Sequence, residues 1–376
     1  MKEIRSQLND MEDLVADFAD RIKIIRKALN GIPRESSTII RIDDHDIKNN
    51  DRQPELTERF EHSPFLVATA DRRGLMLQKG TVIKLGSDKG NRYYNYTDKN
   101  YSIIDVETAL SKALKPGADY YLWLMPNLDR GAYIEIALAS DDPKQGRLIG
   151  GFHTLCNDVG DIDGHPLSGY KAGDILPQSV WCLNHRSAGL QNGTVYDPIA
   201  DQWVMIYLCS GTGKNTRSEC GEKPTVNRNW YQFVDDALKV RGKLFTRAGF
   251  ISAMDGSPNC TSIDEYPDKT GGHTAENGQR VISNIGCEDG TGVLWQWCED
   301  AGQIDHGDSK NWDWKKTDKG SVFGLGGGRD PRCLAGGGSG DGSSAGLVAW
   351  YSDSGASYSY ATVGARFCFS ALHFAE

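Results

Sequence analysis

The first 32 residues carry a repeating hydrophobic pattern. Apolar side chains recur at alternating spacings of four and three residues, at Ile4, Leu8, Met11, Val15, Phe18, Ile22, Ile25 and Leu29. This heptad pattern lines the seam of a left-handed coiled coil, and its bulky, β-branched residues favour a trimer over a dimer. We therefore interpret residues 1–32 as a coiled-coil oligomerisation helix. An amphipathic helix that packs on its own domain is the alternative.

The pattern changes after this helix. Residues 33–63 are mostly polar and charged, and we interpret them as a connector without an assigned function. Residues 64–157 contain short β-rich runs separated by Gly, Pro and Asp. Strands are expected at 80–85, 118–124, 132–138 and 148–152, with a short helix at 106–114. This segment is expected to be a small β-rich intermediate domain.

The last part of the chain, residues 158–376, is rich in Gly, Trp and loop-forming sequence. Its one clear helical pattern lies near Trp230 to Val240. Tryptophans supply large rigid apolar surfaces, and their N–H groups can fix loops in place. We expect a loop-rich domain with a stiff aromatic framework.

Composition and charge exclude several classes of function. The 376 residues are 39% hydrophobic and 25% charged, as in a globular protein with enough apolar mass for two cores. The formal net charge of -9 disfavours a nucleic-acid partner, because such binding depends on clustered Lys and Arg. The N-terminus lacks the apolar stretch of a signal peptide, and no segment approaches the roughly 20 apolar residues that span a bilayer. Classical secretion and membrane insertion are not expected.

The cysteine pattern does not indicate a metal or redox motif. Nine cysteines occur, at Cys156, Cys182, Cys209, Cys220, Cys260, Cys287, Cys298, Cys333 and Cys368, and none forms a CxxC pair. We interpret them as scattered thiols. Cys209 to Cys220 and Cys287 to Cys298 share one separation, which suits local disulfides only in an oxidising setting. HExxH and an evident Ser/His/Asp set are also absent. No catalytic residue, metal site or cofactor is therefore predicted.

Two ordered motifs resemble a known fold family. Residues 283–297, SNIGCEDGTGVLWQW, are similar to the SNxGxxDxxGNVWEW signature of the formylglycine-generating branch of the C-type lectin fold. Residues 242–250, GKLFTRAGF, resemble that branch's GKRLPTEAEW turn, which also follows a helix. The resemblance implies a C-type lectin fold for residues 158–376. The whole chain is then expected to be α+β: a coiled-coil helix, a small β-rich middle domain and a C-terminal lectin fold.

The closing segments narrow the resemblance. Residues 320–323 (GSVF), 350–352 (WYS), 357–360 (SYSY) and 364–366 (GAR) are similar, in order, to the end of the variable proteins of diversity-generating retroelements, a family with phage receptor-binding members. Residues 114–120 (LKPGADY) and 147–153 (RLIGGFH) resemble the β-rich middle domain of such members. The resemblance covers about residues 80–376, whereas the N-terminal coiled coil departs from it.

Residues 336–363 have the restricted alphabet that this resemblance implies for a diversified region. In this family, reverse transcription randomises adenines, usually in Asn codons, whose variants never encode Lys, Glu, Gln, Met or Trp. Only Trp350 belongs to the excluded set here, and it falls at a framework position. A flexible Gly/Ser-rich tail would explain residues 336–344 but not the tyrosines that follow. The ligand-binding positions that the resemblance implies are Gly338, Gly340, Asp341, Ala349, Tyr351, Ser352, Asp353, Ser354, Tyr358, Tyr360, Thr362 and Val363. Of these, Asp353 and Ser354 lie where this chain has an insertion relative to the family.

The resemblance implies a non-enzymatic, tropism-determining protein of a virus. It would form a homotrimer at a fibre or tail tip of the virion, assemble in the host cytoplasm, and bind a protein or glycan receptor on the host surface. Two alternatives are a cell-encoded ligand-display protein of the same retroelement class and a formylglycine-generating, sulfatase-modifying oxidase. Such oxidases bind copper through a cysteine pair, for which Cys333 and Cys368 could be considered. However, the enzyme branch's RGGSW is replaced by AGGGSG at 335–340, so neither cysteine falls at a matched position.

Overall fold

The computed structural model describes residues 58–85, 92–96, 102–106, 110, 112–127, 131–141, 146–301, 312–317, 320–325 and 331–373. The coiled coil predicted at 1–32 lies outside these residues, as do most of the connector at 33–63 and part of the helix predicted at 106–114. These three remain predictions. Among the described residues, no helix has the length and apolar character needed to cross a bilayer.

Two small antiparallel sheets open the described chain. One has the order β1-β4-β5 and the other β2-β3-β6. Their strands are β1 (Arg59–Phe60), β2 (Leu66–Ala68), β3 (Gly74–Leu77), β4 (Thr81–Leu85), β5 (Arg92–Tyr96) and β6 (Ser102–Asp105).

A larger sheet runs through the middle of the molecule in the order β12-β13-β21-β11-β10-β9-β7-β8, and β14 also pairs with β21. Its strands are β7 (Asp119–Asn127), β8 (Gly131–Leu138), β9 (Arg147–His153), β10 (Trp181–Cys182), β11 (His185–Ser187), β12 (Thr194–Asp197), β13 (Gln202–Met205), β14 (Lys243–Leu244) and β21 (Phe367–His373). The sheet crosses the domain boundary predicted after residue 157, because Gly151 of β9 pairs with Trp181 of β10. The two predicted domains therefore share one sheet, and the boundary itself stays a prediction.

The strands expected in the intermediate domain are confirmed at β4, β7, β8 and β9. In β7, Tyr120, Leu122 and Leu124 are all buried, so every second side chain points into one core. Phe152 of β9 stacks on Tyr120 with ring centroids 5.2 Å apart. This alternation is the period that identifies a half-buried strand in a sequence.

A four-stranded sheet lies near the end of the chain. Its order is β19-β18-β15-β20, and β20 runs parallel to β15. The strands are β15 (Trp295–Ala301), β18 (Pro331–Gly336), β19 (Gly346–Gly355) and β20 (Val363–Gly364). Between β15 and β18 in the chain, β16 (Trp312–Thr317) and β17 (Gly320–Leu325) pair with each other as an antiparallel hairpin.

The helix expected near Trp230 to Val240 is confirmed as α3 (Trp230–Lys239). A capping box begins it: Asn229 Oδ1 accepts from the Gln232 backbone N–H at 3.0 Å, and Gln232 Oε1 accepts from the Asn229 N–H at 3.0 Å. Helix α4 (Arg247–Met254) starts at Thr246, whose hydroxyl accepts from the Gly249 N–H. These two helices flank β14, so the 242–250 motif forms a helix–strand–helix turn.

The 283–297 motif supplies buried framework residues. Ser283, Asp289 and Trp297 are fully buried. Gly292 has a φ of +66°, and a Cβ atom there would lie 2.6 Å from the Thr261 carbonyl oxygen. Only glycine fits this position, because both the backbone conformation and the space exclude a side chain.

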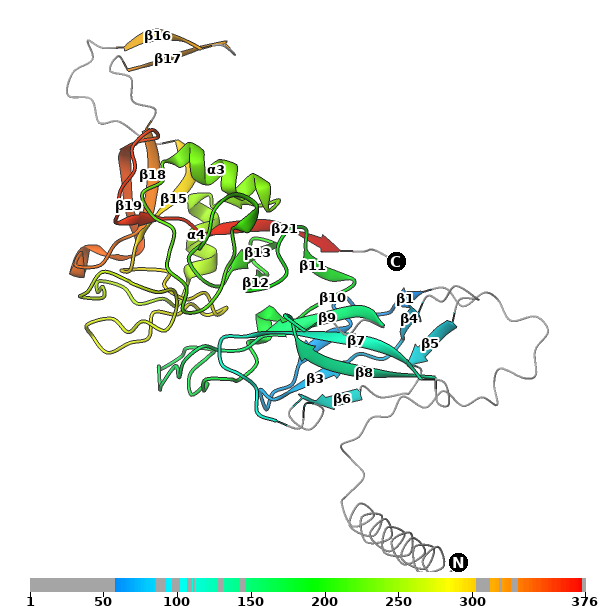
Figure 1. The fold of residues 1–376 in the computed structure, drawn as a ribbon. Helices are drawn as coiled ribbons and strands as arrows, with labels where there is room; N and C mark the ends of the chain where they lie inside the picture. The colour runs from blue at the N-terminus through cyan, green and yellow to red at the C-terminus, as the bar shows by residue number, and fades with distance from the viewer. Residues whose placement is uncertain are drawn as a thin grey trace, which may run out of the picture.

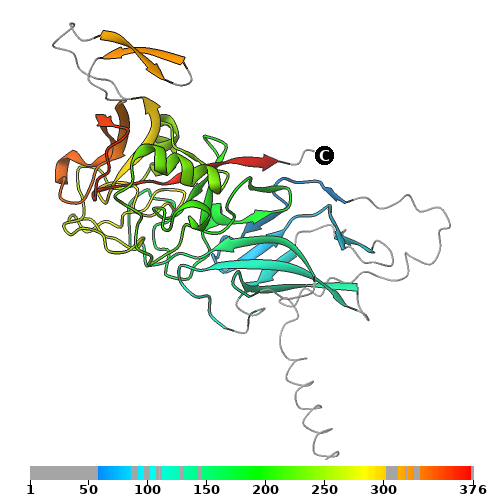
Figure 2. The ribbon, with the colours of Figure 1, turned by 45° about the horizontal axis from the view of Figure 1, so that its top comes forward.

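The β18–β19 end of the molecule and strands β7 and β8 lie far apart (Figure 1). A second view gives the same arrangement, with β21 passing between the two regions (Figure 2). The region predicted to bind a ligand therefore lies at the end of the described molecule away from the intermediate strands.

One buried arginine connects the segments of the C-terminal region. The Arg366 side chain is fully buried, and its guanidinium donates to the backbone carbonyls of Met205, Ile206 and Glu288. Its Nε also donates to Gln296 Oε1 at 3.3 Å. Burial lowers the pKa of Arg366, but an arginine remains charged at neutral pH. The guanidinium thus joins β13, the loop that contains Glu288, and β15 to the start of β21.

Replacing this side chain should destabilise the whole C-terminal region. We expect Arg366→Met to lower the free energy of unfolding by about 3 kcal/mol or more, because each buried carbonyl left without its donor costs about 1–3 kcal/mol. Urea denaturation of the purified chain would measure the loss. Arg59→Met, the same change at an exposed arginine in β1, is the matched control and should change stability by less than about 0.5 kcal/mol. Equal stability of both variants would contradict the structural role of Arg366.

Candidate functional site

The predicted variable region, residues 336–363, spans several consecutive elements of the structure. It begins at the end of β18, passes through a helical turn at Gly342–Ser344 and along β19, and ends at β20. β18 and β20 pair with opposite edges of β15. The two ends of the region are therefore held on either side of one strand.

An aromatic surface lies on one face of this sheet. Leu334 of β18 pairs with Trp297 on one side and with Tyr351 on the other, so these three side chains share a face. Tyr351 is 50% exposed, and its ring centroid lies 6.3 Å from that of Trp295. Trp297 is buried below. The face is thus anchored in the core and open at its edge.

Two further tyrosines extend this surface. Tyr358 is 44% exposed and its ring lies over Gly355, where a Cβ atom would be 3.3 Å away. Tyr360 meets the Tyr358 ring edge to face, with centroids 6.2 Å apart. Tyr360 is half-buried against the core cluster that contains Trp297 and Val363. We name Tyr351, Tyr358 and Tyr360, together with Trp295, the aromatic face.

The exposure of the predicted positions divides them into three groups. Exposed residues are Gly340, Tyr351, Tyr358 and Thr362, and half-buried ones are Asp341, Ala349, Ser352 and Tyr360. Gly338, Ser354 and Val363 are buried. Asp353 lies in β19, and its side chain is outside the described set.

Three of the predicted ligand-binding positions are buried beneath the surface, and a ligand contact at each of them stays a prediction. Val363 pairs with Trp295 in β20 and packs into the core. Ser354 lies opposite Arg332, whose guanidinium stacks on Trp230 at 4.1 Å. Gly338 is covered by the Trp295 ring, 3.2 Å from where its Cβ would be. In the described chain these residues support the surface from below.

Backbone hydrogen bonds set the path of the variable region. The Trp295 N–H donates to the Thr362 carbonyl at 3.2 Å, and the Asn227 N–H donates to the Tyr360 carbonyl at 3.0 Å. At the other end, the Gly340 N–H donates to the Ile263 carbonyl at 3.0 Å. Asp341 is an exception, because its carboxylate accepts from the Gly338 N–H at 2.6 Å. Most exposed side chains of the region therefore take no part in holding its backbone.

Sequence reasoning missed some residues of this surface. Val348 is 69% exposed on β19, and Tyr266 is 45% exposed with its hydroxyl donating to the Ala361 carbonyl at 2.6 Å. Val348 lies inside the variable region but not at a matched position. Tyr266 comes from a loop far earlier in the chain, and no local pattern marks it as a neighbour of Ala361.

A cavity of about 390 Å³ lies elsewhere, between β2 and the strands β11, β12 and β21. His185, Tyr196 and His373 are among its lining residues. Asp201 accepts from Tyr196 at 2.8 Å and lies 2.7 Å from His373 Nε2. Burial, with the neighbouring His373, lowers the pKa of His185 to about 4. None of the predicted ligand-binding residues lines this cavity, so it is separate from the aromatic face.

Other sequence features find structural uses. Residues 211–216, GTGKNT, have part of the pattern of a phosphate-binding P-loop but not its spacing. The Gly213 N–H in this stretch donates to Asp236 Oδ1 at 2.7 Å, so that amide is not available to bind an anion. Cys333 and Cys368 are each 1% exposed, and burial raises the pKa of both thiols to about 12. Both thiols are therefore protonated at neutral pH. Within the described ranges, no group of three His, Cys, Asp or Glu side chains is placed to hold a metal ion.

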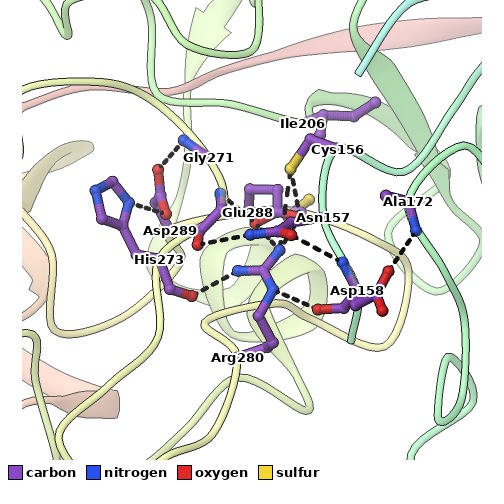
Figure 3. Close-up of polar contacts among 12 residues, drawn as sticks. Cys156, Asn157, Asp158, Ala172, Ile206, Gly271, His273, Arg280, Glu288 and Asp289 are labelled. Atoms are coloured by element: carbon purple, nitrogen blue, oxygen red, sulfur yellow. Dashed lines mark hydrogen bonds and ion pairs between the residues drawn. The ribbon is translucent and has the colours of Figure 1, made fainter. Parts of the chain in front are cut away.

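A buried ion-pair network joins several loops of the C-terminal region (Figure 3). Arg280 donates to both carboxylate oxygens of Glu288, at 2.7 and 2.8 Å, and to the backbone oxygens of His273 and Asp158. Asp289 accepts from the Gly271 N–H at 2.6 Å and lies 2.7 Å from His273 Nδ1. Burial opposes the charge on His273, but the hydrogen bond and charge of Asp289 outweigh it and raise the His273 pKa. This network rigidifies the framework, because its charges are paired and hydrogen-bonded.

Comparison with known proteins supports the predicted resemblance. Residues 65–182 match the family model of the Mtd second domain. The structure is similar to that of the Major Tropism Determinant M1 variant, with a TM-score of 0.62 and 19% sequence identity over 85% of this chain and 86% of that one. The U1 variant matches with a TM-score of 0.61 and 18% identity over 82% and 86% of the two chains. A search of curated protein sequences found no match.

The chain therefore resembles the major tropism determinant in the sequence of its second domain and in its fold. The predicted C-type lectin fold is supported by this likeness, and the described residues are mostly β, with few helices.

Proposed function

We propose that this chain is a viral tropism-determining protein that binds a host receptor through a hypervariable surface diversified by a retroelement. The observation that carries the proposal is that the segment with a restricted set of amino acids also supplies exposed side chains. Residues 336–363 lack Lys, Glu, Gln and Met, and they supply the exposed tyrosines of the aromatic face. The fold likeness to the major tropism determinant supports the same reading.

The chemistry of the aromatic face suits a binding surface that must change its partner. Tyrosine offers broad amphipathic contact at a low cost in side-chain entropy, while Gly, Ser and Asp adapt hydrogen bonding. Tyr351 and Tyr358 are anchored beside Trp295 and Gly355 but remain about half exposed. The proposed contact set is Gly340, Asp341, Ala349, Tyr351, Ser352, Asp353, Tyr358, Tyr360 and Thr362. The predicted positions Gly338, Ser354 and Val363 stay with it as the layer beneath these residues.

The proposal includes a trimer joined by the N-terminal heptads, placed at a fibre or tail tip and assembled in the host cytoplasm. A trimer that engages repeated receptors can gain roughly 10² to 10⁴ in avidity over a single site. Even a weak, newly diversified site can then hold a virion on a cell. The partner would be a protein or glycan of the host surface.

Removing the exposed tyrosines should abolish binding without unfolding the protein. We expect the double variant Tyr351→Ser, Tyr358→Ser to bind host cells at least about tenfold more weakly, because aromatic anchors dominate interfaces of this kind. Its unfolding free energy should stay within about 1 kcal/mol of the parent. Fluorescently labelled protein, tested by flow cytometry on a panel of bacterial strains, would measure the binding.

Tyr133→Ser is the matched control for this experiment. Tyr133 is 42% exposed in β8, away from the aromatic face, so its loss should leave binding unchanged. Equal binding by the double variant and the control would overturn the assignment of the face. A large loss of stability in the double variant would show that Tyr351 and Tyr358 belong to the core.

The encoding DNA tests the mechanism of diversity. We expect a near-copy of the stretch for residues 336–363 close to the gene, differing from it only where the copy has adenine. Sequencing of the locus would find this copy and would also distinguish viral neighbours from cellular ones. A locus without such a copy and without a reverse-transcriptase gene would contradict diversification, while leaving receptor binding to the cell assay.

The oligomeric state tests the avidity argument. Sedimentation equilibrium of the full chain should give a trimer, and a chain of residues 33–376 should dissociate more readily, because the heptad seam is removed. A full chain that stays monomeric at high concentration would refute the trimer.

A further inference from the structure

The structure brings together two cysteines that are far apart in the sequence. All nine cysteines are free thiols, and six of them are buried. Cys260 is exposed, while Cys156 and Cys220 are partly exposed. Cys156 follows β9, and Cys220 lies in the long loop between β13 and α3. The local pairs suggested by sequence spacing, Cys209 with Cys220 and Cys287 with Cys298, are not joined.

Cys156 and Cys220 face each other across a glycine. A Cβ atom on Gly117 would lie 2.8 Å from the Cys220 Cβ and 3.2 Å from the Cys156 Cβ, so both side chains border the same point. The two thiols also hydrogen-bond to each other. A disulfide needs Cβ atoms about 3.5–4.5 Å apart. The empty position at Gly117 leaves room for the two sulfur atoms to approach.

The surroundings of the two sulfur atoms differ. Cys156 Sγ lies 3.3 Å from Glu288 Oε1, and the negative charge of that carboxylate disfavours a thiolate on Cys156. Its hydrogen bond to Cys220 and its burial raise the pKa of Cys156. The same hydrogen bond lowers the pKa of the Cys220 thiol to about 7. A substantial fraction of Cys220 is therefore thiolate near neutral pH, and a thiolate is the nucleophilic form of cysteine.

A buried hydrogen-bonded chain supports this arrangement from the β9 side. His153 Nε2 lies 2.9 Å from the Tyr207 hydroxyl, and His153 Nδ1 lies 2.9 Å from Asp119 Oδ1. The Tyr207 hydroxyl in turn hydrogen-bonds to the cysteine pair. Tyr207 is fully buried, so this hydroxyl has a fixed position. These hydrogen bonds hold the two cysteine side chains in place.

We propose that Cys156 and Cys220 are a thiol–disulfide exchange site that closes into a disulfide when the protein meets an oxidised low-molecular-weight disulfide such as glutathione disulfide. The Cys220 thiolate attacks one sulfur of glutathione disulfide, forms a mixed disulfide and releases one glutathione thiolate, which takes up a proton. Cys156 then gives up its proton, attacks the Cys220 sulfur, and displaces the second glutathione. Two protein thiols are oxidised and one glutathione disulfide is reduced to two glutathione molecules.

The bond would join the end of β9 to the loop that supports the aromatic face. From Cys220 the chain continues through Gly221, whose N–H donates to the Thr270 carbonyl at 2.8 Å. It then reaches Asn227, whose N–H donates to the Tyr360 carbonyl at 3.0 Å. Formation of the disulfide would restrict the motion of residues 220–227 at their N-terminal end. Disulfides are rare in the reducing cytosol and persist outside the cell, so the site would close after release of the protein.

Differential alkylation of the native full chain tests the site. The protein is incubated with reduced or with oxidised glutathione, quenched with N-ethylmaleimide, digested and mapped by mass spectrometry. With oxidised glutathione we expect a peptide pair linked through Cys156 and Cys220, lighter by two hydrogens than the free thiols, while Cys260 is alkylated or carries glutathione. The melting temperature should rise by roughly 5 °C, because the bond closes a long loop.

Two variants complete the test. Cys260→Ser removes the other accessible thiol and should form the Cys156–Cys220 bond and show the same rise in melting temperature. Cys220→Ser should show neither. Full alkylation of Cys156 and Cys220 after oxidation would overturn the proposal, as would a stable mixed disulfide at Cys220 or a Cys209–Cys220 bond. The mapping of the parent chain decides between these outcomes even if Cys220→Ser does not fold, and it requires no receptor.

Discussion

The C-terminal region depends on one buried positive charge. Arg366 sits where β21 begins, and its guanidinium binds carbonyls from β13 and the loop that contains Glu288 as well as the Gln296 side chain. A fully buried guanidinium is tolerated only when its donors are satisfied, so these segments must come together for the region to fold. Gln296 belongs to β15, the strand that carries both ends of the variable region. The placement of the aromatic face therefore follows from the core interaction beneath it.

Elements with a strong local pattern could be predicted from the sequence. Strands β7 to β9 follow from β-rich runs bounded by Gly, Pro and Asp, α3 from its apolar periodicity, and the framework turn at Gly292 from its motif. The continuous large sheet could not be predicted, because β10 and β11 are only 2 and 3 residues long and carry no measurable period. The sequence also could not indicate that Cys156 meets Cys220, since tertiary folding alone brings the two together.

The candidate site shows the same division. Tyr351 and Tyr358 are exposed, as the amino-acid composition of residues 336–363 predicts for a contact surface. The burial of Val363 and Ser354 was missed, because matching positions to a family gives residue identity but not solvent exposure. A short parallel pairing with Trp295 buries Val363, and the cross-strand neighbour Arg332 accounts for Ser354. The burial of both residues depends on how β19 and β20 align with their partner strands, and the residues of the variable region do not determine this alignment alone.

The backbone anchoring of the variable region has a consequence for evolution. The contacts that fix its path are mainly main-chain hydrogen bonds, such as those from Trp295 to Thr362 and from Asn227 to Tyr360. Every amino acid except proline presents the same N–H and C=O groups. Mutations at the exposed positions can accumulate together with little epistasis through the fold. Substitutions at these exposed positions are therefore expected to leave the path of the backbone unchanged.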